Sequence, residues 1–179
     1  MADTLQAVSD RVQIVQNLLN GIPLGGNTLA VQAIQQELSE LGRYIETAQQ
    51  QQAFSSHAGQ EREYLAGCQV QVRKIIQSLD YMMTASAEDY RQAAGEGKND
   101  LEHQPDATQQ SANPEAYQHK SNFWQLTACK DEMRQIASGI METEEQLEHG
   151  QLMQSSFTAN DSVDAGELGA PSDTSSLSP

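Results

Sequence analysis

Apolar residues recur along most of this chain at alternating steps of three and four positions. The pattern runs through four stretches that are separated by polar or glycine-containing segments. Side chains at this spacing lie on one face of an α-helix, so each stretch predicts a helix that buries one narrow apolar seam. The seam positions are Leu5, Val8, Val12, Val15, Leu19; Val31, Ile34, Leu38, Leu41, Ile45, Ala48; Leu65, Cys68, Val72, Ile75, Leu79, Met82; Leu126, Cys129, Met133, Ile136, Ile140, Thr143 and Leu147.

Two breaks separate the first three seams. Pro23 lacks an amide donor and stands among glycines, so residues 21–27 predict a short connection between antiparallel helices. The break at residues 55–59 is weaker, and one continuous rod through it is an alternative. We favour a turn, because the phase of the seam restarts after this break.

The fold class that follows is all-α, an elongated and coiled-coil-like helical bundle. We expect four main helices at about 4–20, 28–56, 60–94 and 114–149, the last with Asn113 as its N-cap and Pro114 at its first position. The chain then divides into a three-helix segment over 1–94, a flexible acidic loop over 95–112, a fourth helix packing on the bundle over 113–154 and a disordered acidic tail over 155–179.

Composition narrows the choice of function. The chain has 179 residues, of which 37% are hydrophobic and 5% aromatic, and it carries a net charge of −15. Few aromatic residues argue against a β-sandwich or barrel. The acidity argues against nucleic acid as a partner, because phosphate binding needs a basic face. Residues 1–94 carry 6 basic and 10 acidic side chains, so −11 of the −15 lies after residue 94.

The location follows from what the sequence lacks. No apolar stretch approaches the length of a transmembrane helix, and the N-terminal residues show no signal-peptide pattern. Two cysteines 61 positions apart do not make a disulfide framework. We therefore expect an intracellular protein of the cytoplasm or nucleus.

The cysteines and histidines do not have the spacing that a catalytic or metal site would need. Cys68 and Cys129 occupy seam positions and are expected to act as small buried hydrophobes, with a redox crosslink between the third and fourth helices as the alternative. The four histidines are far apart in sequence and lack the spacing of a metal site. We expect no catalytic residue, no metal, no cofactor and no small-molecule ligand.

Two other features point toward contacts with proteins. Trp124, the one tryptophan, would either plug the end of the bundle or anchor a partner. An acidic run late in the fourth helix would be a solvated face or a docking site for a basic partner, and it contains Glu142, Glu144, Glu145 and Glu148.

The sequence thus predicts a non-enzymatic interaction module. It would self-associate, or act as a subunit or adaptor among other helical proteins, through its apolar seams. The alternative is a regulatory or signalling bundle, such as the N-terminal module of a receptor-like system, that oligomerises on a trigger. The residues expected to carry the interaction are Val31, Ile34, Leu38, Leu41, Val72, Ile75, Leu79, Trp124, Met133, Ile136 and Ile140.

Overall fold

The computed structural model of the chain describes residues 2–23, 28–52, 58–95 and 100–168. All regular structure in these residues is helical, as the sequence predicts. There are four long helices and a short one: α1 (Ala2–Asn20), α2 (Thr28–Gln52), α3 (Ala58–Ala94), α4 (Ala107–Ala112) and α5 (Pro114–Leu168). None of the helices in this part of the chain is long and apolar enough to cross a membrane.

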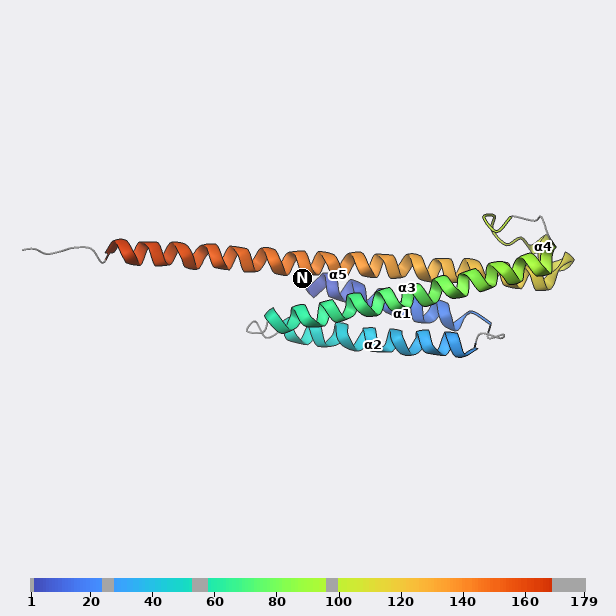
Figure 1. The fold of residues 1–179 in the computed structure, drawn as a ribbon, viewed down its shortest axis with the longest axis horizontal. Coiled ribbons are helices and arrows are strands. Elements are labelled where there is room, and N and C mark those ends of the chain that lie inside the picture. The colour runs from blue at the N-terminus through green and yellow to red at the C-terminus, as the bar shows by residue number, and fades with distance from the viewer. Residues whose placement is uncertain (1, 24–27, 53–57, 96–99, 169–179) are drawn as a thin grey trace, which may run out of the picture.

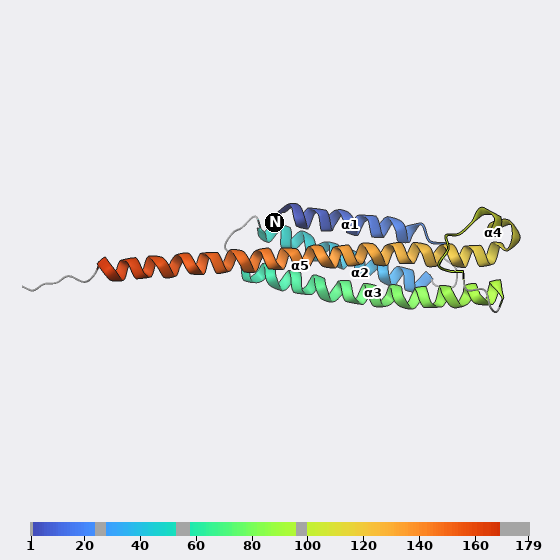
Figure 2. The same ribbon diagram turned by 90° about the horizontal axis from the view of Figure 1, so that it is seen from above.

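The four long helices run up, down, up and down around one core (Figure 1). Helix α1 lies between α2 and α5, and α3 lies between the same two helices on the opposite side. Figure 2 shows the same order from above, with α5 running along α1 and α3. Each long helix therefore has two neighbours. In this arrangement, one narrow apolar seam per helix is enough to form the shared core.

The core confirms the predicted seams position by position. Every one of the seam residues is buried, and all but Thr143 belong to one continuous apolar cluster, which Ile22 extends. The Thr143 hydroxyl donates to the Gly139 carbonyl one turn earlier, at 2.9 Å, so its polar atom is satisfied inside the helix. Burial of the seams against one another is what holds the four helices together.

The break between the second and third helices is a real one. Helix α2 is described to Gln52 and α3 begins at Ala58, and the two helices pack side by side in opposite directions. The favoured turn is therefore confirmed over the continuous rod. The expected end of the second helix at residue 56 lies outside the described residues.

The last helix differs from the prediction at its C-terminal end. It begins at Pro114 as expected, but it continues through residues 155–168, which the sequence assigned to a disordered tail. No proline occurs between residues 114 and 171, and a glycine such as Gly150 costs a helix only about 1 kcal/mol. Composition alone therefore placed the end too early. Residues 169–179 lie outside the described part of the chain.

Helices α1 and α5 lie close together at Gly139. A Cβ atom built on Gly139 would lie only 2.6 Å from Cγ2 of Val8, which is buried in the core. Nearby, Arg11 of α1 pairs with Glu132 of α5 at 2.8 Å, on the outside of the same contact. The missing side chain of Gly139 is thus what allows α1 to seat against α5.

Gly139→Ala is expected to destabilise the bundle. The added methyl group would displace a β-branched side chain that has little rotamer freedom, and such overpacking costs about 1–3 kcal/mol. Gly42→Ala is the matched control, because a Cβ there meets nothing within 4 Å. It should gain about 0.5–1 kcal/mol from helix propensity. Chemical denaturation of both variants measures the difference, and equal gains at both glycines would contradict the close approach.

Leu38→Asp is expected to unfold the chain. Leu38 is fully buried, and a carboxylate at the centre of an apolar core has no partner to offset its desolvation. Leu29→Asp is the control on the same helix, because Leu29 is 82% exposed. It should change the free energy of unfolding by no more than about 0.5 kcal/mol. Circular dichroism compares the two, and retained helicity in Leu38→Asp would refute the role of the seam.

Candidate functional site

The residues expected to carry an interaction lie inside the protein. All of them except Trp124 are buried in the common core. They would meet a partner only if the bundle opened or exchanged a helix. Trp124 is half-buried, and its indole Nε1 donates to the carbonyl of Leu101 at 2.8 Å, which matches the expected plug at the end of the bundle.

The end of the bundle near Trp124 is built differently from the rest. Here α3 and α5 run on beyond α1 and α2 (Figure 1). The segment from Asp100 onward folds back over them and carries α4, so this part has defined structure where the composition predicts a flexible loop. Leu101 is buried there with Tyr90 and Ala116, in a small cluster separate from the main core. The segment replaces the two missing helices as a cover.

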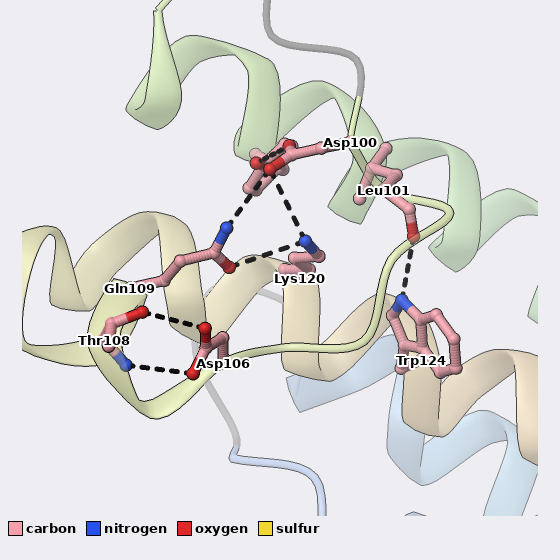
Figure 3. A network of polar contacts seen from close by, with 8 residues as sticks. Asp100, Leu101, Asp106, Thr108, Gln109, Lys120 and Trp124 are labelled. Carbon is pink, nitrogen blue, oxygen red and sulfur yellow. Dashed lines mark hydrogen bonds and ion pairs between the residues drawn. The ribbon is translucent and has the colours of Figure 1, made fainter.

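A polar cluster holds this segment in place (Figure 3). Asp100 is at its centre. The carboxylate accepts hydrogen bonds from the Tyr90 hydroxyl and from Nε2 of Gln109, the latter at 3.1 Å. Nζ of Lys120 lies 3.7 Å from Oδ2 of the same carboxylate. The contacts join α3, α4 and α5 through one acidic side chain, and we refer to Tyr90, Asp100, Gln109 and Lys120 as the Asp100 cluster.

Lys120 is the unusual member, because its side chain is fully buried. An ammonium group removed from water needs partners. Besides Asp100, its Nζ lies 3.4 Å from Oε1 of Gln109 and 5.9 Å from the centre of the Tyr90 ring. These contacts compensate the buried charge only while the segment is docked. The charge therefore makes the position of Asp100 specific.

The cluster also shifts the pKa values of its members. The hydrogen bond from Tyr90 is the largest cause that lowers the pKa of Asp100. Burial opposes it, and the charge of Lys120 and the hydrogen bond from Gln109 lower the pKa further. Burial, followed by the contact with Asp100, raises the pKa of Tyr90 to about 12. At neutral pH the phenol is thus a donor, and the carboxylate is ionised next to the buried cation.

Side-chain caps fix the two ends of the segment. Asp106 accepts from the amide and the hydroxyl of Thr108 and so begins α4. Asn113 accepts from the amide of Ala116 at 3.1 Å, which confirms it as the predicted N-cap of α5. Its own amide group donates to the carbonyl of Ala93 at 2.9 Å, so the cap also ties α5 to the end of α3.

The arrangement can position a chain segment, because Tyr90, Gln109 and Lys120 all contact the carboxylate of Asp100. A cavity of about 90 Å³ lies beside Tyr90, Asp100 and Gln109, between the ends of α3 and α5. Asn113, the N-cap of α5, and Tyr117 also line it. Sequence reasoning missed this cluster, because its members meet only when the segment from Asp100 folds back against α3 and α5. The lone apolar Leu101 within a polar stretch was the one signal of a docked segment.

The cysteines are buried thiols, as expected for seam positions. Both are free, and neither side chain is exposed. Burial raises the pKa of Cys68 and of Cys129 to about 12, with a smaller contribution from Glu144 for Cys68 and from Glu132 for Cys129. Because the thiolate is the reactive form, neither is set up as a nucleophile.

Histidines and acidic residues do not gather into a ligand set. No group of three or more His, Cys, Asp or Glu side chains able to hold a metal occurs in the part of the chain that the structure describes. In the acidic run late in α5, Glu148 pairs with Arg62 of α3 at 2.7 Å, and both side chains are largely exposed. Burial and then Glu148 raise the pKa of Glu144. The run is thus partly used within the bundle.

Asp100→Asn is expected to release the segment, because Lys120 would keep its charge and lose its counterion. At neutral pH this should cost about 1–3 kcal/mol. The double variant Asp100→Asn with Lys120→Met removes the buried charge as well and should recover much of the loss. Trp124 fluorescence reports the docking directly, since its indole bonds to Leu101. If both variants lost the same stability, the buried charge would not be the cause.

The same contact predicts how docking depends on pH. The pKa of Asp100 is lowered in the folded chain. The stabilisation that its carboxylate gives to docking is therefore complete above the ordinary pKa of a carboxyl group, about 4. It is lost as the pH falls through the lowered value. Trp124 emission should therefore change in an acid titration below about pH 4. The Asp100→Asn variant should lack that step.

Known proteins give no guide to this site. The chain matches no protein-family model, and no curated protein and no solved structure is detectably similar to it. Its function has to follow from its own surfaces and contacts.

Proposed function

We propose that this protein is a non-enzymatic helical interaction module, a subunit or adaptor that docks on other proteins with its bundle already formed. This is the class of function that the sequence predicts, but with the outer faces of the bundle in place of the apolar seams as the contact surface. The seams hold the chain's own helices together, so partners would be met by the outer faces. The Asp100 cluster would serve to stabilise one end of the module.

One observation carries this proposal. Helix α5 runs past the end of the bundle, and in both views its last part projects away from the other helices (Figures 1 and 2). Where it leaves the bundle, Leu152 and Met153 are 67% and 63% exposed. A helix without neighbours is marginal in water, and packing against another surface is what normally stabilises it. A protein partner would supply that surface.

A specific observation also supports the alternative, a regulatory bundle that oligomerises on a trigger. All four seams are closed within a single chain, which is what a stable monomer requires. Assembly would then need an event that frees a surface, such as release of the segment around Asp100. For either function we propose the cytoplasm or nucleus as the location.

The mass of the native assembly tests the proposal. The purified chain is expected to run as a monomer of 19.6 kDa by light scattering over a wide range of concentration. In a gentle extract of its source cell, the same chain should elute in a larger complex that contains other proteins. A Leu152→Asp, Met153→Asp variant should leave the purified monomer folded and reduce the complex if α5 contributes to it.

Two results would separate the possibilities. A monomer in the extract as well as in pure form would contradict the interaction module. A larger species made only of this chain, appearing in the cell and not in pure form, would favour the triggered oligomer. Met141→Asp is the control for the α5 variant, since Met141 is 54% exposed on the same helix within the bundle.

A further inference from the structure

The segment that covers the end of the bundle is held by few of its own side chains. We call residues 100–112 the strap. Leu101 is the one strap residue that is buried, and α4, which forms the second half of the strap, buries none. Ordering a chain segment costs conformational entropy at every residue, and burial of apolar surface is what usually offsets that cost. We therefore expect the strap to open while the main core stays folded.

Two consecutive strap residues make three different contacts with α3 and α5 (Figure 3). The carboxylate of Asp100 faces the ammonium group of Lys120, with Nζ 3.7 Å from Oδ2. The carbonyl oxygen of Leu101 accepts from the indole of Trp124 at 2.8 Å. The side chain of Leu101 is buried in the small cluster that includes Tyr90. The end of the bundle thus recognises an anion, an apolar side chain and a carbonyl group within two residues of chain.

The groups on α3 and α5 depend on the strap for their partners. Lys120 is fully buried, and it contacts Asp100, Gln109 and the ring of Tyr90, of which the first two belong to the strap. The indole of Trp124 would also lose its acceptor if the strap left. An ammonium group and an N–H donor without partners cost free energy unless water or another ligand replaces them. The open site therefore presents a cation, a donor and an apolar surface.

The strap does not fill its site. A cavity of about 90 Å³ remains where the strap meets the bundle. Asp100 and Gln109 line it from the strap, and Tyr90 and Ala116 line it from α3 and α5. Atoms that border a void lack packing partners on that side. A ligand with more bulk than the strap would make contacts here that the strap does not make.

We propose that the strap is an autoinhibitory contact, which occupies a docking site for a segment of another protein in which an acidic residue is followed directly by leucine. Asp100 and Leu101 are the built-in occupant, and their contacts define what the partner must carry. The partner's carboxylate would pair with Lys120, and its leucine would enter the cluster beside Tyr90. The carbonyl of that leucine would accept from Trp124. Strap and partner exclude each other, because each fills the same site.

The buried charge favours this occupant over others. A basic or purely apolar segment would leave the ammonium group of Lys120 without a counterion. A second copy of the chain carries the same pair, Asp100 and Leu101, but its own site already holds that pair at the high effective concentration of a tethered segment. A partner protein has no such competing site. This inference rests on the proposed interaction function and adds a second docking site, which the strap closes.

Peptide binding to the purified full chain tests the site. The probe is a fluorescently labelled peptide of residues 100–110, and anisotropy measures its affinity. Leu101→Ala in the protein loosens the strap, so this variant should bind the probe about tenfold or more tightly than the wild type does. Leu101 lies outside the main core, so circular dichroism should show the variant folded. Equal affinity of the two proteins would contradict competition by the strap.

Changes in the probe and in the site identify the contacts. Asp100→Asn or Leu101→Ala in the peptide should each weaken its binding to the Leu101→Ala protein about tenfold or more. Lys120→Met, added to that protein, should have the same effect. Lys74→Met is the matched control, because it removes an exposed lysine of α3 outside the site.

Two results of these measurements would overturn the proposal. One is an unchanged affinity for the Asp100→Asn peptide, which would mean that the buried cation does not recognise the acid. The other is an equal loss with the two lysine variants. The changes in the peptide leave the protein intact, so they decide the matter even if Lys120→Met disturbs the end of the bundle.

The native complex separates this inference from the proposed function. In a gentle extract of the source cell, Leu101→Ala should increase the share of the chain in the larger complex, and adding Lys120→Met should remove that increase. A complex that forms equally with each of these chains overturns the strap site and leaves the interaction function standing. The absence of a complex with any of them overturns both. A wild-type dimer that Leu101→Ala abolishes would assign the site to a second copy and overturn the partner protein.

Discussion

The burial of four narrow seams against one another is the interaction on which the rest of this structure depends. Each seam is a single stripe of apolar side chains, so a chain with only 37% hydrophobic residues can fill the core. Each fully buried Leu, Ile, Val or Met contributes about 1.5–3 kcal/mol. Outside the core, ion pairs and amide hydrogen bonds also join neighbouring helices.

The end of the bundle near Trp124 follows another rule. Helices α3 and α5 outrun their partners there, and a polar segment takes the place of two helices. An apolar cover would have sufficed for burial. The buried Lys120 instead requires one acidic partner at one place, which makes the docking of the segment specific and sensitive to the ionisation of Asp100. A bundle that is stable elsewhere thus has one end that responds to charge.

A closed core also decides where partners can be met. Val31, Ile34 and the other seam residues pack against one another inside the bundle, so they are not accessible to another protein. What remains is the projecting part of α5 and the grooves between helices.

The sequence by itself determined the helices and the face that each one buries, because a step of three and four residues is a property of a single helix. Every seam position, from Leu5 to Leu147, could be identified in this way. Tertiary structure alone decided that the seams meet within one chain, that Gly139 admits Val8, and that Lys120 lies against Asp100. Those contacts join residues whose positions relative to one another depend on how the helices pack, which no local pattern encodes. The end of α5 at Leu168 was also missed, because a polar composition lowers helix propensity without marking the residue at which a helix ends.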